Sequence, residues 1–457
     1  MELKGKRLLV LGGTNNANDI HDFAEREGIK IVVAGSYFST EIEEIADEKY
    51  YVDIYDTEQL KKVIKEHNID GIFCGGNEDI ISRVIDVAEE MGYPFYSSRI
   101  LWDTLMNKKR FKEACIEYNV PTVNGYSVDE HDLYKSAREL PYPVVVKPVD
   151  NSGSTGVRKC CNVDEFIEFY NNAKELSKSN EAIVEDYIEG DNIIVYYTFV
   201  DGNVTLSSMA DKYMRGNSCE FNPLAEVHAY PSRHLPAYVK DVDAQMRNML
   251  LGLGIKNGIT SMQGFVREGR FYFFEMGYRL GGTAQYRYTA KLNNINSLHM
   301  MMAYALTGKM TGYVQGNDNA FFDKPCCTLT LMSKGGKVGK IIGLEEARKK
   351  QGVIYIENRY KEGDTIKVTG NVSQFHFRAY LVGKTIEDVK NLISYIQSTI
   401  KAYDEKGESM LITDFDVNRL DFGDVKFARG GYRVIVILPF LTALDNNQGS
   451  KMLGRAA

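Results

Sequence analysis

The 457-residue sequence lacks an apolar run long enough to cross a bilayer, since the longest, Val434 to Leu441, is far too short. The N-terminus lacks the apolar core of a secretory signal. The 7 cysteines form no CxxC pair, and the 7 histidines are as dispersed, so neither a disulfide framework nor a zinc site is indicated. These absences favour a reduced, cytoplasmic protein that does not enter a membrane.

A strong charge of one sign is also missing. The net charge is -7, and acidic and basic residues are spread along the whole chain without a lysine or arginine stripe, so nucleic acid is not an expected partner. The 10 prolines and 40 glycines are scattered, which argues against a long disordered linker. The length and the 44% hydrophobic content suit two or three packed domains.

The first hundred residues alternate apolar strands with amphipathic helices. The expected strands are Arg7–Leu11, Ile31–Ala34 and Gly71–Cys74, and the expected helices are Asn18–Glu27, Thr57–His67, with Thr57 as its cap, and Asp79–Met91. Continuously apolar strands between helices indicate a parallel sheet covered on both faces. We assign this α/β domain to residues 1–102.

Strands dominate the rest of the chain. A single helix is expected from Asp103 to about Val120, followed by a small strand-rich unit over 122–184 and a run of longer strands interrupted by a helix over Pro236–Leu253. We assign residues 103–312 to a second domain and residues 313–457, with a helix at Thr385–Ile400, to an α+β C-terminal domain. The last 37 residues include a strand-like Tyr432–Leu438 and have no assigned role.

A lysine and a glycine-serine loop form the sharpest feature for chemistry. The apolar strand Val144–Val146 leads into Lys147, and small residues follow: Ser152, Gly153, Ser154, Thr155 and Gly156. Such a loop brings backbone N–H groups and hydroxyls up to a phosphate without obstruction, while the lysine supplies positive charge. The lysine precedes the glycines, so this is not a Walker A loop, and a plain hairpin turn would explain the same residues.

A second pattern lies in the expected hairpin around Glu268-Gly269. A two- or three-residue turn there places Gln263 opposite Glu275 or one position off, and two oxygen side chains on neighbouring strands can hold a hard cation. Arg279 follows closely and could stabilise charge on a phosphorylated intermediate. A buried Arg279–Glu275 ion pair without metal is the plainer interpretation.

In their order and spacing these elements resemble the ATP-grasp superfamily, which includes biotin carboxylase and D-alanine–D-alanine ligase. The resemblance implies an α/β and α+β fold with an N-terminal Rossmann-like pre-grasp domain, a lid subdomain and a strand-rich C-terminal domain. It makes Lys147 and the 152–156 loop the lid over a triphosphate, and Lys108 a second phosphate-binding lysine. Glu185 with the Tyr187-Ile188 backbone would bind adenine, and Asn192 the ribose.

The resemblance also assigns the metal and substrate residues. Glu275 and Gln263 would hold one or two Mg²⁺ ions, although the family usually has a second glutamate in place of Gln263 and an asparagine in place of Gly277. Either the phosphates and Glu275 hold the metal, or another carboxylate such as Asp211 compensates, or the site is inactive. The expected substrate residues are Glu78, Arg279, Gly281 and Gly282, with Glu78 alternatively explained as a helix N-terminal acid.

The implied activity is an ATP-dependent ligation in which a carboxylate is activated as an acyl phosphate and joined to an amine, with release of ADP and phosphate. Lys147 and Arg279 would be the catalytic residues, ATP and Mg²⁺ the cofactors, and small molecules the partners, while relatives suggest a homodimer. Two alternatives remain open: a non-catalytic or regulatory ATP-binding protein, and a carboxylase that uses bicarbonate. The sequence names neither the acid nor the amine.

Overall fold

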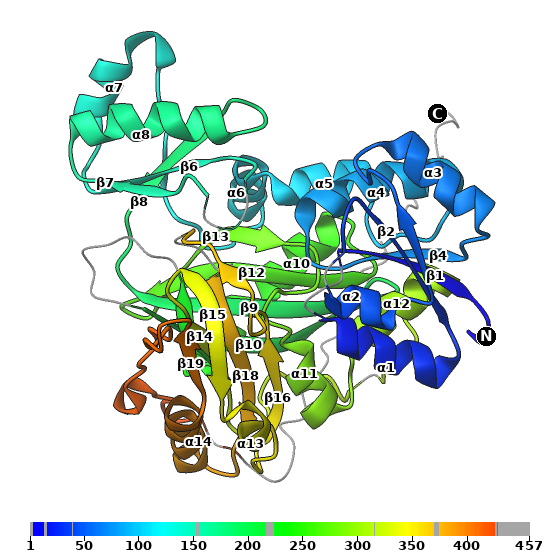
Figure 1. Ribbon diagram of the computed structural model, residues 1–457. Helices are drawn as coiled ribbons and strands as arrows, with labels where there is room; N and C mark the ends of the chain where they lie inside the picture. The colour runs from blue at the N-terminus through cyan, green and yellow to red at the C-terminus, as the bar shows by residue number, and fades with distance from the viewer. Residues whose placement is uncertain are drawn as a thin grey trace, which may run out of the picture.

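The computed structural model describes residues 3–12, 16–38, 40–151, 153, 155–215, 224–314, 316–369, 374–425 and 427. It consists of an N-terminal α/β unit, a large central antiparallel sheet, a small lid beside that sheet, and a C-terminal part on the sheet's far end (Figure 1). Among the described helices, none combines the length and apolar character needed to span a membrane.

The N-terminal unit is built on a four-stranded parallel sheet in the order β3-β2-β1-β4. Its strands are β1 (Arg7–Leu11), β2 (Lys30–Gly35), β3 (Glu48–Tyr51) and β4 (Gly71–Cys74), and its helices are α1 (Ala17–Glu27), α2 (Thr40–Ile45), α3 (Thr57–Glu66) and α4 (Glu78–Met91). Alternate residues of β1 face opposite ways, with Leu9 packed toward α3 and α4 and Leu8 toward α1. The predicted parallel sheet with two covered faces is therefore present.

Two details of this unit differ from the expectation. β3 and α2 were not expected. Glu48–Tyr51 is an edge strand that lacks the continuous apolar run of its neighbours, and its residues alternate only between half-buried and exposed. The cap of α3 is Asp56 rather than Thr57, because the Asp56 carboxylate accepts hydrogen bonds from the backbone N–H groups of Glu58 and Gln59.

The single helix expected from Asp103 is two helices, α5 (Arg99–Met106) and α6 (Lys108–Glu117). Asn107 ends the first and caps the second, since its side chain accepts from the N–H groups of Lys109 and Arg110 at 3.0 and 3.1 Å. An asparagine that bonds local backbone competes with helix continuation, which explains the break. The break places Lys108 in the first turn of α6.

The lid is a four-stranded sheet in the order β5-β8-β6-β7 with two helices on one face (Figure 1). Its elements are β5 (Gly125–Tyr126), the 3-10 turn η2 (Glu130–Asp132), α7 (Leu133–Glu139), β6 (Val144–Pro148), β7 (Arg158–Cys160), α8 (Val163–Leu176) and β8 (Ala182–Asp186). Its own core joins Phe166 and Tyr170 of α8 to Val144 and Val146 of β6.

The central sheet has eight strands in the order β13-β12-β9-β10-β11-β14-β18-β16, all antiparallel to their neighbours. The strands are β9 (Asp191–Val200), β10 (Asn203–Met214), β11 (Ala225–Tyr230), β12 (Gly258–Arg267), β13 (Arg270–Gly277), β14 (Cys326–Met332), β16 (Val353–Asn358) and β18 (Phe375–Val382). Because β14 pairs directly with β11, one sheet runs across the domain boundary expected at residue 312.

Helices cover parts of both faces of this sheet. They are α9 (Leu235–Asp241), α10 (Asp243–Gly252), α11 (Tyr286–Tyr288), the π-helical η3 (Thr289–Asn293) and α12 (Ser297–Thr307). The helix expected over 236–253 is thus interrupted at Val242. Tyr197 of β9 packs with α9 and α10, whereas its neighbour Tyr196 faces the core that contains α11 and α12.

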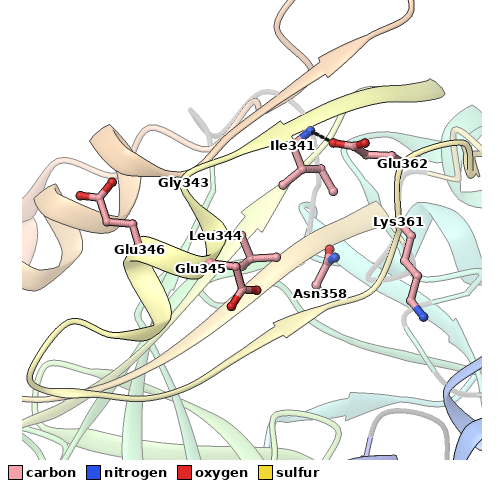
Figure 2. A pocket seen from close by; sticks show the side chains of 8 residues that line it. All are labelled: Ile341, Gly343, Leu344, Glu345, Glu346, Asn358, Lys361 and Glu362. Atoms are coloured by element: carbon pink, nitrogen blue, oxygen red, sulfur yellow. Dashed lines mark hydrogen bonds between the residues drawn. The ribbon is translucent and has the colours of Figure 1, made fainter.

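The C-terminal part adds a small sheet in the order β17-β15-β19 and further helices. These elements are β15 (Gly336–Ile342), α13 (Leu344–Arg348), β17 (Thr365–Ile366), α14 (Ile386–Thr399), β19 (Lys401–Asp404) and the 3-10 turn η5 (Val417–Arg419). The strand expected at 432–438 lies outside the described residues. A surface hollow of about 480 Å³ lies between β15, α13 and Lys361. Figure 2 shows side chains that line it, and none of them is an expected site residue.

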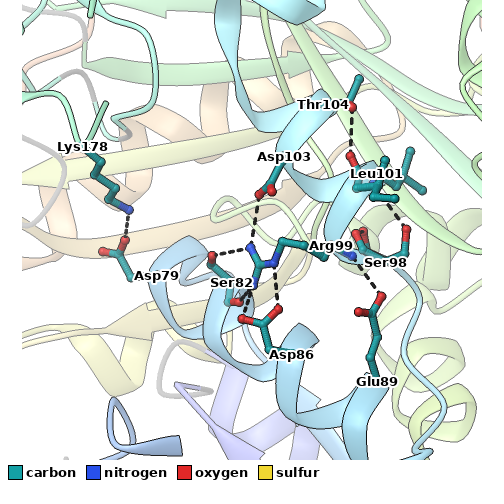
Figure 3. A network of polar contacts seen from close by, with 12 residues as sticks. Asp79, Ser82, Asp86, Glu89, Ser98, Arg99, Leu101, Asp103, Thr104 and Lys178 are labelled. Carbon is teal, nitrogen blue, oxygen red and sulfur yellow. Dashed lines mark hydrogen bonds and ion pairs between the residues drawn. The ribbon is translucent and has the colours of Figure 1, made fainter. Parts of the chain in front are cut away.

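Polar contacts tie the N-terminal unit to its neighbours (Figure 3). Arg99, at the start of α5, bonds the Asp86 carboxylate of α4 through Nε and Nη2, both at 2.8 Å. Lys178, in the turn after α8 of the lid, lies 2.5 Å from Asp79 in the first turn of α4. The Lys178–Asp79 pair is exposed and contributes little stability, but it joins the lid to the first turn of α4.

Gly71→Ala is expected to destabilise the fold, because a Cβ at this position of β4 would lie 2.2 Å from the Ala305 carbonyl oxygen of α12. Overpacking of this kind costs about 1–3 kcal/mol. Thermal unfolding should show a lower Tm for this variant. Gly282→Ala is the matched control, since a Cβ there meets nothing within 4 Å; an equal Tm for both variants would contradict the close approach of β4 and α12.

Candidate active site

Two lysines from different elements meet one buried carboxylate at the base of the lid. The Glu185 side chain of β8 lies 2.6 Å from the Lys147 ammonium of β6 and 2.5 Å from the Lys112 ammonium of α6. Lys147 can reach Glu185 because Val145, two residues earlier on β6, is paired with Glu185 on the adjacent antiparallel strand β8. Gly125 leaves room for Lys112, since a Cβ there would lie 3.0 Å from its ammonium nitrogen.

The charges of this cluster are mutually dependent. Burial on its own would raise the pKa of the Glu185 carboxyl, but Lys147 and Lys112 outweigh it and lower the pKa. A buried charge is tolerated only when it is paired, and here one carboxylate faces two ammonium groups. The cluster therefore carries a net positive charge and can attract an anion to Lys147.

Lys147 also reaches the central sheet. Its ammonium donates to the Phe274 carbonyl of β13 at 3.4 Å and lies 5.0 Å from the centre of the Phe274 ring. The next residue along β13 is Glu275, the expected metal ligand. The lid lysine thus contacts β13 one residue before the expected metal ligand, although 127 residues separate Lys147 from Phe274.

Lys108 is buried beside the start of the lid loop rather than exposed on a helix surface. Its ammonium donates to the Asn151 carbonyl at 2.6 Å, and its backbone N–H donates to the Val149 carbonyl. Of the expected loop residues, Gly153, Thr155 and Gly156 are described, whereas Ser152 and Ser154 lie outside the described residues. Gly153 and Gly156 have φ values of 63° and 77°, a backbone region that glycine adopts without strain.

The expected adenine-binding segment follows the end of β8. The Glu185 carboxylate forms ion pairs with Lys112 and Lys147, so it is not directed toward an adenine ring. Tyr187 and Ile188 come after Asp186, the last residue paired with β6, and the Lys159 ammonium lies 3.8 Å above the Tyr187 ring. Asn192, at the start of β9, is half-buried and is paired with Phe265 and Lys212 on the two neighbouring strands.

The hairpin expected around Glu268-Gly269 is confirmed. Both residues have positive φ, 51° and 75°, as a two-residue type I′ turn requires. In the resulting register Gln263 of β12 lies directly opposite Glu275 of β13, and a bulge follows after Gln263. The two oxygen-bearing side chains consequently share one face of the sheet.

A lysine of β10 lies on the same face of the sheet as Gln263 and Glu275. The Lys212 ammonium of β10 donates to the Gln263 Oε1 at 2.7 Å. Removal from water lowers the pKa of Lys212 to about 8, and the Glu275 carboxylate opposes that shift. The sequence left two interpretations of Lys212 open, a residue that reaches phosphate or substrate and, more plainly, part of a surface turn after a strand. Lys212 belongs to β10 itself.

Asp211 does not compensate for the missing second carboxylate. As the neighbour of Lys212 in a strand it points to the other face of the sheet, where its carboxylate accepts from the Ser232 hydroxyl at 2.6 Å and the Arg233 N–H at 2.8 Å. Gly277 adds no ligand either: a Cβ there would lie 3.2 Å from the Ser261 hydroxyl. The available donors are the Glu275 carboxylate and the Gln263 amide oxygen, which suit one Mg²⁺ that phosphate oxygens and water complete.

The expected substrate residues come together where the N-terminal unit meets the central sheet. The Arg279 guanidinium pairs with the Glu78 carboxylate, 2.8 Å from Nε and 2.7 Å from Nη2. Glu78 opens α4 after the loop that follows β4, which is where ligands bind in parallel α/β sheets. Arg279 is thus paired with Glu78 and not with Glu275, the alternative that the sequence left open.

The glycines after Arg279 lie against the same region. A Cβ at Gly281 would lie 3.0 Å from the Tyr196 ring, so the chain approaches the sheet closely there, while Gly282 is exposed with free space around it. The Gly282 carbonyl accepts a hydrogen bond of 2.7 Å from Arg378 Nη1.

Two buried residues near these groups were not found from the sequence. Arg378 of β18 is 2% exposed, and its Nε has no hydrogen-bond partner among the described residues. His228 of β11 is paired with Lys212 and Thr328 across the sheet, and burial, followed by Lys212 and Arg378, lowers its pKa well below the usual value. The sequence around each residue predicts a strand but contains no functional motif. The side chains that surround them belong to strands far away in the sequence.

A family model for the ATP-grasp domain matches residues 140–286. The formate-dependent phosphoribosylglycinamide formyltransferase of Wolinella succinogenes is 25% identical over 277 residues, which cover 60% of this chain and 70% of that protein. The enzyme of the same name from Sulfurisphaera tokodaii is 27% identical over 198 residues, or 42% of this chain and 50% of that one. The chain thus spans between half and 70% of these two relatives.

Solved structures share the fold over most of the chain. An L-amino acid ligase from Bacillus licheniformis has a TM-score of 0.71 with 18% identity and covers 88% of this chain and 99% of its own. The biotin carboxylase domain of the Hydrogenobacter thermophilus 2-oxoglutarate carboxylase, solved with MgADP and bicarbonate, has a TM-score of 0.72 with 19% identity and covers 89% and 91%. The chain therefore carries an ATP-grasp domain over residues 140–286, and it shares its fold over most of its length with these two solved enzymes.

Proposed function

We propose that the chain is an ATP- and Mg²⁺-dependent ligase that activates a small carboxylate as an acyl phosphate and joins it to a primary amine at the Arg279–Glu78 pair. The pair carries the proposal because it offers a cation for the acid and an anion for the amine within one contact of 2.7 Å. The relatives' name, formate-dependent phosphoribosylglycinamide formyltransferase, makes formate the first acid to consider and an amine of a phosphorylated sugar derivative the first acceptor.

The nucleotide would lie between the lid and the central sheet. Lys147 and Lys108 would contact its phosphates, and Glu185 would act as a positioning residue that holds Lys147 at the base of the lid. The Tyr187-Ile188 backbone beyond β8 would meet the adenine edge, and Asn192 would reach the ribose. Glu275 would hold Mg²⁺, which when bound neutralises phosphate charge and orients the terminal phosphoryl group.

The chemistry then takes two steps in this region. A carboxylate oxygen attacks the γ-phosphorus, the bond from that phosphorus to the bridging oxygen breaks, and ADP leaves with the electron pair. The amine nitrogen next attacks the acyl carbon, the carbon–oxygen bond to phosphate breaks, and the amine proton passes to solvent or to Glu78. Arg279 would stabilise the charge on the acyl phosphate, and Gly281 and Gly282 would let the substrate approach the backbone.

An ADP-release assay tests the reaction directly. With ATP and Mg²⁺ present, ADP formation should require both an acid and an amine when formate, acetate, amino acids and bicarbonate are combined with amino acids and glycinamide derivatives. ADP that requires bicarbonate alone would instead indicate a carboxylase. Nucleotide binding without ADP under every combination would contradict the ligase and favour the non-catalytic alternative.

Lys147→Ala should weaken ATP binding by on the order of 10- to 100-fold, the usual loss for a charge-assisted hydrogen bond. Isothermal titration with ATP measures the change. Lys135→Ala, an exposed lysine of α7 in the same lid, is the matched control and should bind ATP as the unaltered chain does. Equal affinities for the two variants would show that the lid has been misassigned.

Arg279→Lys and Glu78→Gln should affect different parts of the reaction. Arg279→Lys should lower kcat by roughly 100-fold, because a lysine cannot reproduce the forked donors that stabilise an acyl phosphate. Glu78→Gln should raise the KM for the amine with a smaller effect on the acid. Steady-state kinetics with each substrate varied separately distinguishes these effects, and an unchanged amine KM in Glu78→Gln would remove Glu78 from the amine site.

A further inference from the structure

The metal position contains less negative charge than a pair of divalent ions needs. On the face formed by β13, β12 and β10, the oxygen donors near one another are the Glu275 carboxylate and the Gln263 amide. Across the described ranges, no three histidine, cysteine, aspartate or glutamate side chains are grouped so that they could hold a metal ion. Mg²⁺ prefers one or two carboxylates together with phosphate oxygens and water, so this donor set suits a single ion on Glu275.

The amide oxygen of Gln263 already has a cationic partner. The Lys212 ammonium donates to that oxygen at 2.7 Å, and residues 212 and 263 reach one another across the intervening strand β9. A divalent ion bound to the same oxygen would be placed beside an ammonium group without a second carboxylate to offset the repulsion. The position of a second ion is therefore next to a side chain that carries its own positive charge.

Gly277, two residues along β13 from Glu275, offers no further ligand. A Cβ there would come within 3.2 Å of the Ser261 hydroxyl and 3.9 Å of the Arg279 guanidinium carbon. The Arg279 guanidinium therefore lies close to Gly277 at this end of β13, while Lys212 contacts Gln263 on the neighbouring strand. Both of these neighbouring side chains are cationic, and neither adds a carboxylate to the metal position.

From this arrangement we propose that the chain binds ATP with one Mg²⁺ on Glu275, and that the Lys212 ammonium takes the place of a second metal ion by contacting the terminal phosphate. The proposal rests on the ATP site proposed above. Lys212 would be fixed by Gln263, whose neutral side chain accepts from the ammonium without pairing off its charge. Gln263 would then be a positioning residue for Lys212 and not a metal ligand.

Counting bound metal ions tests the stoichiometry without any turnover. Mn²⁺ replaces Mg²⁺, and the electron paramagnetic resonance signal of free Mn²⁺ is followed while it is titrated into the full chain with adenylyl imidodiphosphate, with the nucleotide alone as the reference. One Mn²⁺ per nucleotide-bound chain is expected. Two tightly bound ions per chain would overturn the proposal while leaving the ligase assignment intact.

Lys212→Met tests the contact with the terminal phosphate. Affinity for adenylyl imidodiphosphate should fall on the order of 10- to 100-fold, whereas affinity for ADP should change by no more than about twofold, since only the analogue carries a third phosphate. Lys240→Met, an exposed lysine of α9, is the matched control and should leave both affinities unchanged. Equal losses for both nucleotides, or no loss for either, would contradict the assigned contact.

A double variant tests the metal count separately from the effect of removing the buried Lys212 ammonium. Lys212→Met combined with Gln263→Glu removes the ammonium and adds the second carboxylate, and it should raise the count to two Mn²⁺ per nucleotide-bound chain. A count that stays at one would show that Lys212 does not occupy the position of a second ion. If the unaltered chain binds neither nucleotide, the ATP site proposed above fails together with this inference.

Discussion

The antiparallel register of β12 and β13 is the constraint on which the rest of the site depends. A two-residue turn at Glu268-Gly269 fixes that register, because both residues adopt the positive φ that a tight hairpin needs. The register sets Gln263 opposite Glu275. The registers of β9 with β12 and with β10 then determine that Lys212, and not Asp211, points to the same face of the sheet. A slip of one residue would exchange these side chains for their neighbours on the opposite face.

The lid is connected to this sheet by charge as well as by the chain. Glu185 lies between Lys112 of α6 and Lys147 of β6, so the carboxylate fixes the lysine that extends toward β13. Removing Glu185 would leave two ammonium groups in a buried place without a carboxylate between them, which is costly. The exposed Lys178–Asp79 pair makes a second and weaker link between the lid and the first turn of α4, which carries Glu78. The lid and the substrate residues are in this way connected on two sides.

The two departures from the usual family pattern have a common physical explanation in the structure. A glutamine at position 263 suits an ammonium partner, because its oxygen accepts from Lys212 while its neutral charge leaves the ammonium able to act on an anion. A glycine at position 277 suits the close approach of Ser261 and Arg279. The proposed compensation is a cation in place of an additional carboxylate, which a search for metal ligands alone would not find.

The sequence by itself determined the elements whose signals are local. Apolar strands between amphipathic helices predicted the parallel N-terminal sheet, the Glu268-Gly269 turn predicted the hairpin and the pairing of Gln263 with Glu275, and Glu78 and Arg279 were both singled out by their place after strands. Local signals also misled in places, since Asn107 and Val242 break helices that periodicity alone would continue. Only the tertiary structure decided that Glu185 joins two lysines, that Arg279 pairs with Glu78, and that Lys212, His228 and Arg378 line one region. These contacts join strands and helices that are far apart in the chain. The order of strands in a sheet is set by how whole elements pack together, and the residues that flank a single strand in the sequence do not determine it.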